Sequence, residues 1–184
     1  MMVFNYNVIP LKKTLSYLRK SGRKIKKFIM FTTILLYDVN KIKLPVDESQ
    51  PINPYINEYV FSKYISEEVT KLYSEIPTII VRMSNIYGPT KLIRPDLVPT
   101  LMQSVIADQN TEVWSTKPER DLIYVKDAAD AIVALLDADY TGHVNFGTGT
   151  AHSVGEVVCI VEKLSGKKIK VLDVPVTGPM KFVA

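Results

Sequence analysis

Short apolar runs alternate with longer helical patterns along this 184-residue chain, and this alternation restricts its fold more than any other feature. Residues 25–36 contain one continuous apolar run, and residues 78–83 contain a second. Continuous apolar runs are typical of strands buried on both faces of a parallel sheet. Helical spacing of leucines precedes the first run, and a helical pattern separates it from the second. We therefore expect an α/β fold with a largely parallel sheet.

Turn-forming and helix-ending residues set the boundaries of the expected elements. Ser21-Gly22 ends the first helix, prolines mark a loop over residues 38–55, and Pro77 follows the second helix. Ser153 and Glu156 carry the spacing of a capping box, so a helix begins there and runs to Leu164. The other expected helices are 5–21, 57–75, 96–108 and 126–137, and the expected strands are 25–36, 78–83, 112–114, 122–125, 143–146 and 168–174.

Composition indicates a globular protein in a reducing compartment. The hydrophobic content is 47% with charges of both signs, which is typical of a folded domain. Cys159 is the single cysteine, so no internal disulfide forms, and its place on the apolar side of a helix predicts a buried, inert thiol. The longest apolar run, residues 28–37, is too short for a bilayer crossing of about 20 residues. With no secretory signal at Met1, we expect a cytoplasmic location and no membrane contact.

Positive charge is concentrated at the start of the chain. Residues 1–43 carry ten Lys or Arg and one acid, whereas the whole chain has a net charge of +4. Such a block fits either a solvated helix face or a surface for nucleic acid or anionic lipid. The cluster at residues 23–27 has no interleaved aromatic residues or glycines that could read bases. We favour the solvated face and keep nucleic-acid binding as the weaker alternative.

One helical segment carries a candidate acid–base pair. Tyr59 and Lys63 lie four residues apart, so a helix places them on the same face. The ammonium group favours the anionic form of the phenol, which suits it to exchange a proton with an alcohol or ketone. The same spacing occurs at Tyr37/Lys41 and Tyr87/Lys91, but a turn-like stretch and Pro89 oppose a helix through those pairs.

Five sequence blocks occur in a fixed order over nearly the whole chain. They are residues 28–33, 54–63, 82–89, 120–127 and 145–149. Together they resemble the extended short-chain dehydrogenase/reductases, and more narrowly the nucleotide-sugar epimerase/dehydratase branch. The resemblance implies an incomplete Rossmann-type, doubly wound parallel sheet plus part of a small C-terminal substrate domain.

The resemblance also divides the chain by function. Residues 1–89 match the C-terminal half of the NAD(P)-binding domain and residues 90–184 match the substrate-binding region. Residues 120–138 are expected to pack back on the cofactor domain. Both ends of the chain look cut, so we expect the isolated chain to bind NAD or NADP poorly and to have little or no activity.

The resemblance implies specific roles for six residues. Tyr59 would be the acid–base residue, Lys63 would hold the nicotinamide ribose, and Thr33 would hydrogen-bond the reacting sugar oxygen. Ser84 would contact the nicotinamide through its main chain. Asn85 and Arg120 would contact the diphosphate of a nucleotide-diphosphate sugar, for which the planar guanidinium is well suited.

Plainer explanations stay open for these residues. Thr33 fits an ordinary strand threonine, and Tyr59/Lys63 a solvated helix pair. Asn85 fits a turn cap, and Arg120 fits a surface ion pair with Asp121 or Glu119. The two histidines, His143 and His152, lack the spacing of metal ligands, so we expect structural or surface roles for them and no metal site.

The sequence also departs from the family pattern. The loop Gly-x-Gly-x-x-Gly is absent, and the one Gly-x-Gly tract, residues 147–149, belongs to a late block where cofactor binding is not expected. Ile34-Leu35 follow Thr33 where dehydratases and decarboxylases carry acidic residues, so we expect an epimerase or a keto-sugar reductase. The alternatives are a non-catalytic subunit, with a homodimer or partner chain completing the sheet, and a basic nucleic-acid-binding protein.

Overall fold

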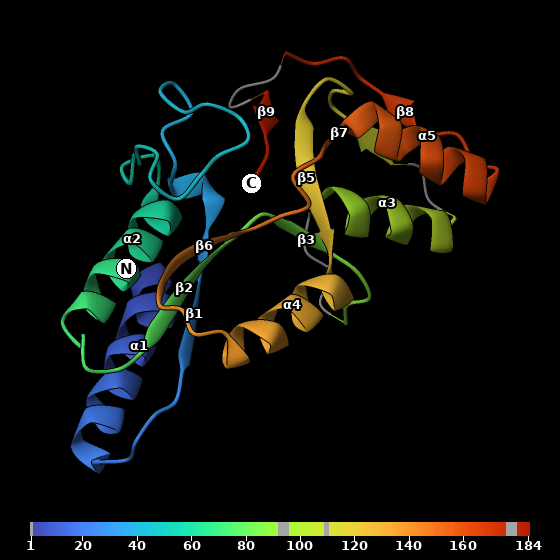
Figure 1. Cartoon of the computed structure of the whole chain (residues 1–184). Coiled ribbons are helices and arrows are strands. Elements are labelled where there is room, and N and C mark those ends of the chain that lie inside the picture. The colour runs from blue at the N-terminus through green and yellow to red at the C-terminus, as the bar shows by residue number, and fades with distance from the viewer. Residues whose placement is uncertain (1, 92–95, 109–110, 176–179) are drawn as a thin grey trace. The chain divides into compact units, whose positions relative to one another are not determined.

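A computed structural model describes residues 2–91, 96–108, 111–175 and 180–184 (Figure 1). The chain forms two compact units that are interleaved in sequence. The first contains the described residues through Ser84 together with 130–146, and the second contains residues 85–129 and 147–184. The predicted assignment of residues 1–89 to cofactor binding and 90–184 to substrate binding stays a prediction.

The first unit is built on a three-stranded parallel sheet. Its strands are β1 (Phe28–Thr33), β2 (Thr78–Met83) and β6 (Gly142–Phe146), in the order β1-β2-β6. β2 lies in the middle and is almost entirely buried, as its continuous apolar sequence predicts. This arrangement confirms the predicted α/β fold with a parallel sheet of the Rossmann type.

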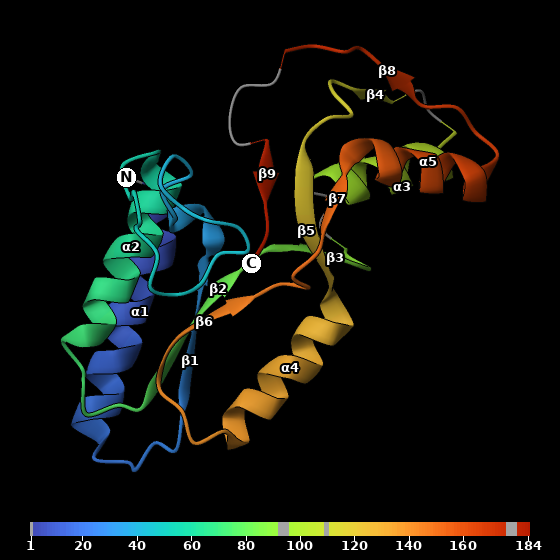
Figure 2. The ribbon, with the colours of Figure 1, turned by 45° about the horizontal axis from the view of Figure 1, so that its top comes forward.

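Two helices pack against each other in the first unit, along one side of this sheet. They are α1 (Met2–Ser21) and α2 (Glu58–Lys71), which lie side by side in both ribbon views (Figures 1 and 2). The leucine stripe of α1 points inward, and Leu15 at its centre packs with Tyr73 and Ile76. Asn57 begins α2, because its side chain accepts a hydrogen bond from the backbone N–H of Val60 at 2.9 Å.

The second unit combines short strands with two packed helices. β5 (Glu119–Tyr124) pairs in parallel with β3 (Asn85–Tyr87) and β9 (Lys181–Phe182), and antiparallel with β7 (Ala151–Ser153). β4 (Glu112–Val113) pairs with β8 (Lys170–Val171), while α3 (Leu97–Ile106) and α5 (Val154–Ser165) pack together through apolar residues. The predicted capping box of α5 is confirmed. The remaining helix, α4 (Val125–Asp137), contributes to both units.

The strand predicted over residues 25–36 is wrong at both ends. β1 covers only Phe28–Thr33, and the 3₁₀ helix η1 (Ile34–Leu36) follows it. The side chain of Thr33 accepts a hydrogen bond from the backbone N–H of Leu35 and so turns the chain out of the strand. β1 is also not buried on both faces, because Phe31 is 44% exposed.

Other elements differ from the predictions because tertiary pairing decides them. The strand expected over 168–174 is limited to two residues, and β3, β7 and β9 were not expected. Cys159 is exposed rather than buried, because α5 packs through its neighbour Val158 and through Val161. Among the described residues, no helix has both the length and the apolar character needed to cross a membrane.

Candidate functional site

Lys63 connects α2 to the carboxyl end of β1. Its ammonium group donates a hydrogen bond to the carbonyl oxygen of Phe31 at 3.2 Å, two residues before Thr33 on the strand. The same nitrogen lies 5.8 Å from the centre of the Tyr59 ring. Burial lowers the pKa of Lys63 below the ordinary value for lysine. The structure thus brings Tyr59 and Lys63, as one helical stripe, to the strand that carries Thr33.

Thr33 is buried, and its hydroxyl takes part in a hydrogen bond with the residue two positions later. Its oxygen accepts from the backbone N–H of Leu35 at 3.2 Å, which uses a lone pair and leaves the hydroxyl proton available for donation. Tyr59 is 42% exposed. A hydroxyl donor and a phenol on neighbouring elements are the groups needed to handle one oxygen atom of a substrate.

Ser84 lies just beyond β2 in the same unit. Its backbone N–H donates to the carbonyl oxygen of Phe146 at 2.8 Å, so its remaining groups for a ligand are its carbonyl and hydroxyl. The hydroxyl is buried and has no hydrogen-bond partner among the described residues. A buried hydroxyl without a partner is costly, and a polar ligand would relieve that cost. Together with Lys63, Ser84 therefore fits the amide and ribose groups of a nicotinamide cofactor.

Asn85 and Arg120 belong to the second unit, on adjacent strands. The side-chain amide of Asn85 donates to the carbonyl oxygen of Asp121 at 3.4 Å. Arg120 donates to the carbonyl oxygens of Glu119 at 2.9 Å and Met180 at 3.4 Å, and burial lowers the pKa of its guanidinium. The carboxylate of Glu119 pairs with Lys181 instead. The structure therefore brings Asn85 and Arg120 near each other.

The Gly-x-Gly tract holds a carboxylate of the chain itself. Asp121 is fully buried and accepts hydrogen bonds from the backbone and hydroxyl of Thr148, both at 2.8 Å. It also accepts from the backbone N–H groups of Gly149 at 3.0 Å and Ala184 at 3.3 Å. A Cβ atom at Gly147 would collide with this carboxylate. The N–H groups of Thr148 and Gly149, which could otherwise face a phosphate, are thus bonded to Asp121.

A buried ionic cluster in the first unit escaped the sequence analysis. Arg82 of β2 donates to both carboxylate oxygens of Glu67 on α2, at 3.1 and 2.7 Å. His143 of β6 lies 3.1 Å from the same carboxylate. Burial raises the pKa of Glu67, but the hydrogen bonds from His143 and Arg82 outweigh it and leave the pKa below the ordinary value. A charged residue inside the apolar run 78–83 was the available signal, because a buried charge requires a partner.

The cluster continues to the loop that follows η1. The guanidinium of Arg82 lies 4.9 Å from the centre of the Tyr37 ring. The hydroxyl of Tyr37 donates to the side chain of Asn145 at 2.8 Å, and Asn145 donates to the carbonyl oxygen of Val46 and the carboxylate of Glu48. These contacts fix the loop that begins beyond Thr33.

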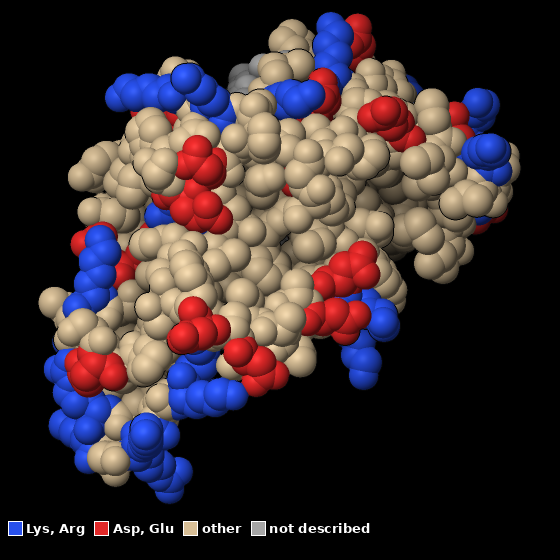
Figure 3. Space-filling model, in the orientation of Figure 1, with Lys and Arg blue, Asp and Glu red and all other residues tan. Residues whose placement is uncertain are grey.

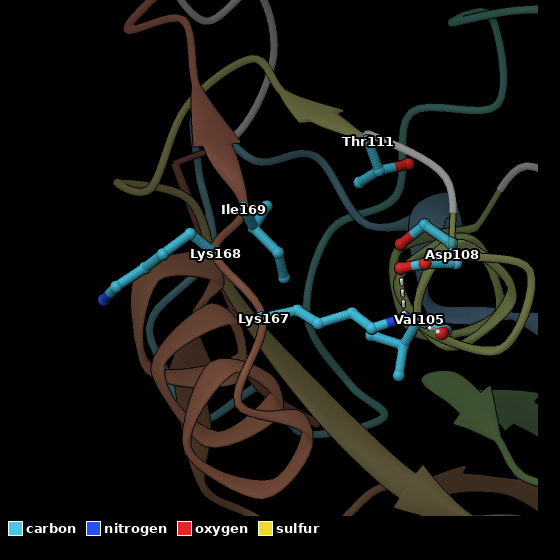
Figure 4. A pocket seen from close by; sticks show the side chains of 7 residues that line it. Val105, Asp108, Thr111, Lys167, Lys168 and Ile169 are labelled. Carbon is cyan, nitrogen blue, oxygen red and sulfur yellow. Dashed lines mark hydrogen bonds and ion pairs between the residues drawn. The ribbon is translucent and has the colours of Figure 1, made fainter.

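Two hollows lie away from the predicted site residues. The first, about 320 Å³, lies in the second unit between the ends of α3 and α5 (Figure 4). Lys167 extends across it to Asp108 at 2.6 Å and to the carbonyl oxygen of Val105 at 2.7 Å, so its charge is already neutralised. It contains none of the predicted site residues.

The second hollow, about 540 Å³, follows α1 and is lined by Lys12, Lys13 and Lys20 beside Tyr17. Figure 3 shows basic side chains gathered over the end of α1 and the segment after it. The expected solvated basic face and the nucleic-acid alternative both concern this surface, and both stay predictions.

A parallel α/β sheet with a Tyr-x-x-x-Lys helix beside a strand-end threonine defines a short-chain dehydrogenase/reductase. The profile of the NAD dependent epimerase/dehydratase family matches residues 3–147. The chain belongs to this family.

Curated relatives and solved structures agree with this placement. A putative UDP-glucose 4-epimerase of Methanocaldococcus jannaschii is 34% identical over 125 residues, covering 65% of this chain and 40% of the relative. YtcB of Bacillus subtilis, described as an uncharacterized UDP-glucose epimerase, is 27% identical over 89% of this chain and 52% of its own length. The chain thus spans about half the length of the curated relatives it matches.

The fold agrees closely with solved structures of other proteins. A UDP-N-acetylglucosamine 4-epimerase from Methanobrevibacter ruminantium superposes with a TM-score of 0.87 at 22% identity, over 97% of this chain and 59% of that one. The Bordetella bronchiseptica enzyme WbmG, solved in complex with NAD, has a TM-score of 0.79 at 26% identity, over 96% and 55%.

Proposed function

We propose that this chain carries the acid–base site of an NAD(P)-dependent nucleotide-sugar epimerase or keto-sugar reductase. The observation that supports the proposal most directly is the hydrogen bond from Lys63 to the carbonyl of Phe31, because it sets the Tyr59–Lys63 stripe beside the strand end that carries Thr33. Membership of the family and the relatives named as UDP-glucose epimerases support the same conclusion.

In this proposal the three groups act on one sugar oxygen. Tyr59 takes a proton from a sugar hydroxyl, or returns one to the ketone, while the positive charge of Lys63 favours the phenolate. Thr33 donates a hydrogen bond to the same oxygen through its O–H group, while the oxygen of that group accepts from the N–H of Leu35. When bound, the nicotinamide cofactor supplies hydride transfer at the sugar carbon. Lys63 and the main chain of Ser84, whose N–H is already bonded to Phe146 and whose carbonyl is therefore the remaining backbone group, would hold that cofactor.

Binding of the nucleotide diphosphate falls to the second unit. Arg120 would contact the phosphates, and Asn85 on the adjacent strand would assist it. The half-buried guanidinium strengthens attraction to an anion, since burial reduces screening by water. The proposed substrate is therefore a nucleotide-diphosphate sugar, as in the relatives whose names specify UDP sugars.

The residues after Thr33 favour epimerisation or reduction over water elimination. Ile34 is buried and Leu35 is exposed, and neither can move a proton. A 4,6-dehydratase or decarboxylase that uses acidic residues after the hydroxyl would lack them here. Epimerase and reductase chemistry need only the groups already described.

Ligand titration followed by NMR tests the proposal. Adding NAD is expected to shift the signals of Thr33, Lys63 and Ser84, and adding UDP-glucose those of Asn85 and Arg120. Shifts restricted to other residues would contradict it, whereas small shifts that appear only at millimolar ligand would agree with the weak binding expected of the isolated chain. Where interconversion of UDP-glucose and UDP-galactose is measurable, Tyr59→Phe should lower it by about 100-fold or more, with Tyr64→Phe on the same helix as the control.

The alternative of a non-catalytic subunit rests on the edge of the sheet. Among the described strands, β1 pairs with β2 alone, so its other edge is open to a homodimer partner or another chain. Stable co-purification with a second polypeptide, together with ligand binding only in that complex, would favour this alternative.

A further inference from the structure

Three residues of α2 lie on one stripe at successive spacings of four. They are Tyr59, Lys63 and Glu67, of which the proposed function uses only the first two. Residues four apart on a helix lie one above the other, so the direction of one side chain is coupled to the direction of the next. The anchoring of Glu67 therefore bears on where Lys63 points.

Glu67 is the most firmly held member of the stripe. Its side chain is 3% exposed, and Arg82 reaches both of its oxygens through the two-pronged geometry that fixes a carboxylate most strictly. His143 is on the neighbouring strand β6, and its Nε2 atom lies 3.1 Å from the Oε2 atom of Glu67. Glu67 thus connects α2 to β2 and β6 at once.

Lys63 extends the same pattern to the third strand. It contacts the carbonyl of Phe31 on β1, so one helical stripe is attached to all three strands of the parallel sheet. The contact of Lys63 is a single hydrogen bond from a long, flexible side chain, whereas that of Glu67 is a buried ion pair. The stronger contact sets the rotation of the helix, and the weaker one follows from it.

We propose that Glu67, clamped by Arg82 and His143, is a positioning residue that aims Lys63 at β1 and so sets the geometry of the Tyr59–Lys63 pair. The functional meaning of this inference rests on the proposed acid–base role of that pair. The inference itself is that the direction of the Lys63 side chain depends on the carboxylate of Glu67, one helical turn away.

The titration of Lys63 provides a readout that a purely structural role would not move. The pKa of Lys63 is lowered by burial, so displacing its ammonium into water should raise that pKa toward the ordinary value for lysine. Loss of the negative charge of Glu67 without displacement should act in the opposite direction and lower the pKa further. A role limited to stability should leave the pKa of the folded protein unchanged.

The experiment uses the full chain labelled with [13Cε]lysine, with the Lys63 signal assigned by its loss in Lys63→Arg. The pKa of Lys63 is measured in Glu67→Gln and in the double variant Glu67→Met with Arg82→Met. The double variant leaves no charge unpaired, which keeps a folded protein available if Glu67→Gln unfolds. Glu68→Gln, at the exposed neighbouring position, is the matched control.

A rise in the pKa of Lys63 in the double variant, with no rise in the control, is the expected result. An unchanged pKa or a fall in that variant would overturn the proposal. Since the titration needs neither cofactor nor substrate, a rise in a chain that shows no ligand binding would uphold the positioning role while the proposed function fails.

Discussion

Glu67 in the first unit and Asp121 in the second are deeply buried carboxylates in hydrogen-bonded clusters, and the two are satisfied in different ways. Glu67 in the first unit is held by charged or chargeable side chains, Arg82 and His143, from two strands. Asp121 in the second unit is held by neutral donors, which are the backbone N–H groups of Thr148, Gly149 and Ala184 and the hydroxyl of Thr148. The first arrangement joins a helix to a sheet, and the second folds a loop around a strand.

This difference determines what each carboxylate leaves behind when it is removed. Without Glu67, the guanidinium of Arg82 would stay buried with no counter-charge, which is among the costliest defects in a protein. Without Asp121, a few neutral donors lose their acceptor, and part of that loop can turn toward water. Removing a carboxylate that is held by charged partners should therefore cost more stability than removing one that is held by neutral donors.

The largest effect is expected from Glu67→Ala. An uncompensated buried Arg82 should reduce the free energy of unfolding by about 3–5 kcal/mol, measured by urea denaturation. Glu68→Ala is the matched control, because the exposed pair of Glu68 with Lys71 contributes about 1 kcal/mol or less. Equal losses in the two variants would mean that the buried cluster contributes no more than a surface pair.

A smaller loss is expected from Asp121→Ala. Removing the acceptor of four donors should cost about 2–3 kcal/mol, detected as faster hydrogen exchange in the second unit. The exchange rates of the first unit should stay close to those of the parent chain. Asp127→Asn, at an exposed position in the same unit, is the control, and a loss of protection as large in the first unit would break the comparison.

Acid should weaken the first unit through Glu67. Its pKa is below the ordinary value in the folded state, so its contribution is complete above the unfolded pKa of about 4.3 and is lost as the pH falls through the folded pKa. The stability difference between the parent chain and Glu67→Gln should therefore shrink between pH 6 and 3, roughly the range around those pKa values. Urea denaturation across that range measures it, and a difference that grows would refute the assignment.

The smallest effects are expected at the helix caps, where the two units should behave alike. Asn57→Ala at the start of α2 and Ser153→Ala at the start of α5 each remove one side-chain acceptor of a backbone N–H. Each should cost about 1 kcal/mol in thermal denaturation. Asn57→Ser and Ser153→Asp, which keep an acceptor, should retain most of that stability. A much larger loss of stability from one of the two alanine substitutions than from the other would contradict this expectation.

The sequence contained enough information for the main elements of both units. The mainly apolar segment at residues 78–83 predicted a buried strand, and the Ser153–Glu156 spacing predicted the start of α5. It could not predict β3, β7 or β9, because strands of two or three residues have no periodicity and form only when their partner is present. The end of β1 was missed because the capping hydrogen bond of Thr33 is a local contact that leaves no pattern.

The sequence predicted the pair of site residues on α2, but it did not predict the buried ionic cluster around Glu67. The Tyr59–Lys63 pair followed from spacing and from the helical context. Arg82, inside an apolar strand, signalled that an acid must lie nearby, but the chain offers 19 acidic residues and no rule selects Glu67 among them. Asp121 gave no signal at all, since nothing in its local sequence reveals that a distant glycine tract surrounds it.

The hydrogen bond from Lys63 to Phe31 has a consequence for solubility. β1 pairs with one strand among those described, and its exposed phenylalanine makes it a natural template for unwanted strand addition. The ammonium group of Lys63, hydrogen-bonded to the carbonyl of Phe31, hinders such addition. Lysines on the edge strands of many natural sheets have the same effect. The side chain proposed to assist proton transfer would then also keep separate copies of the chain from sticking together.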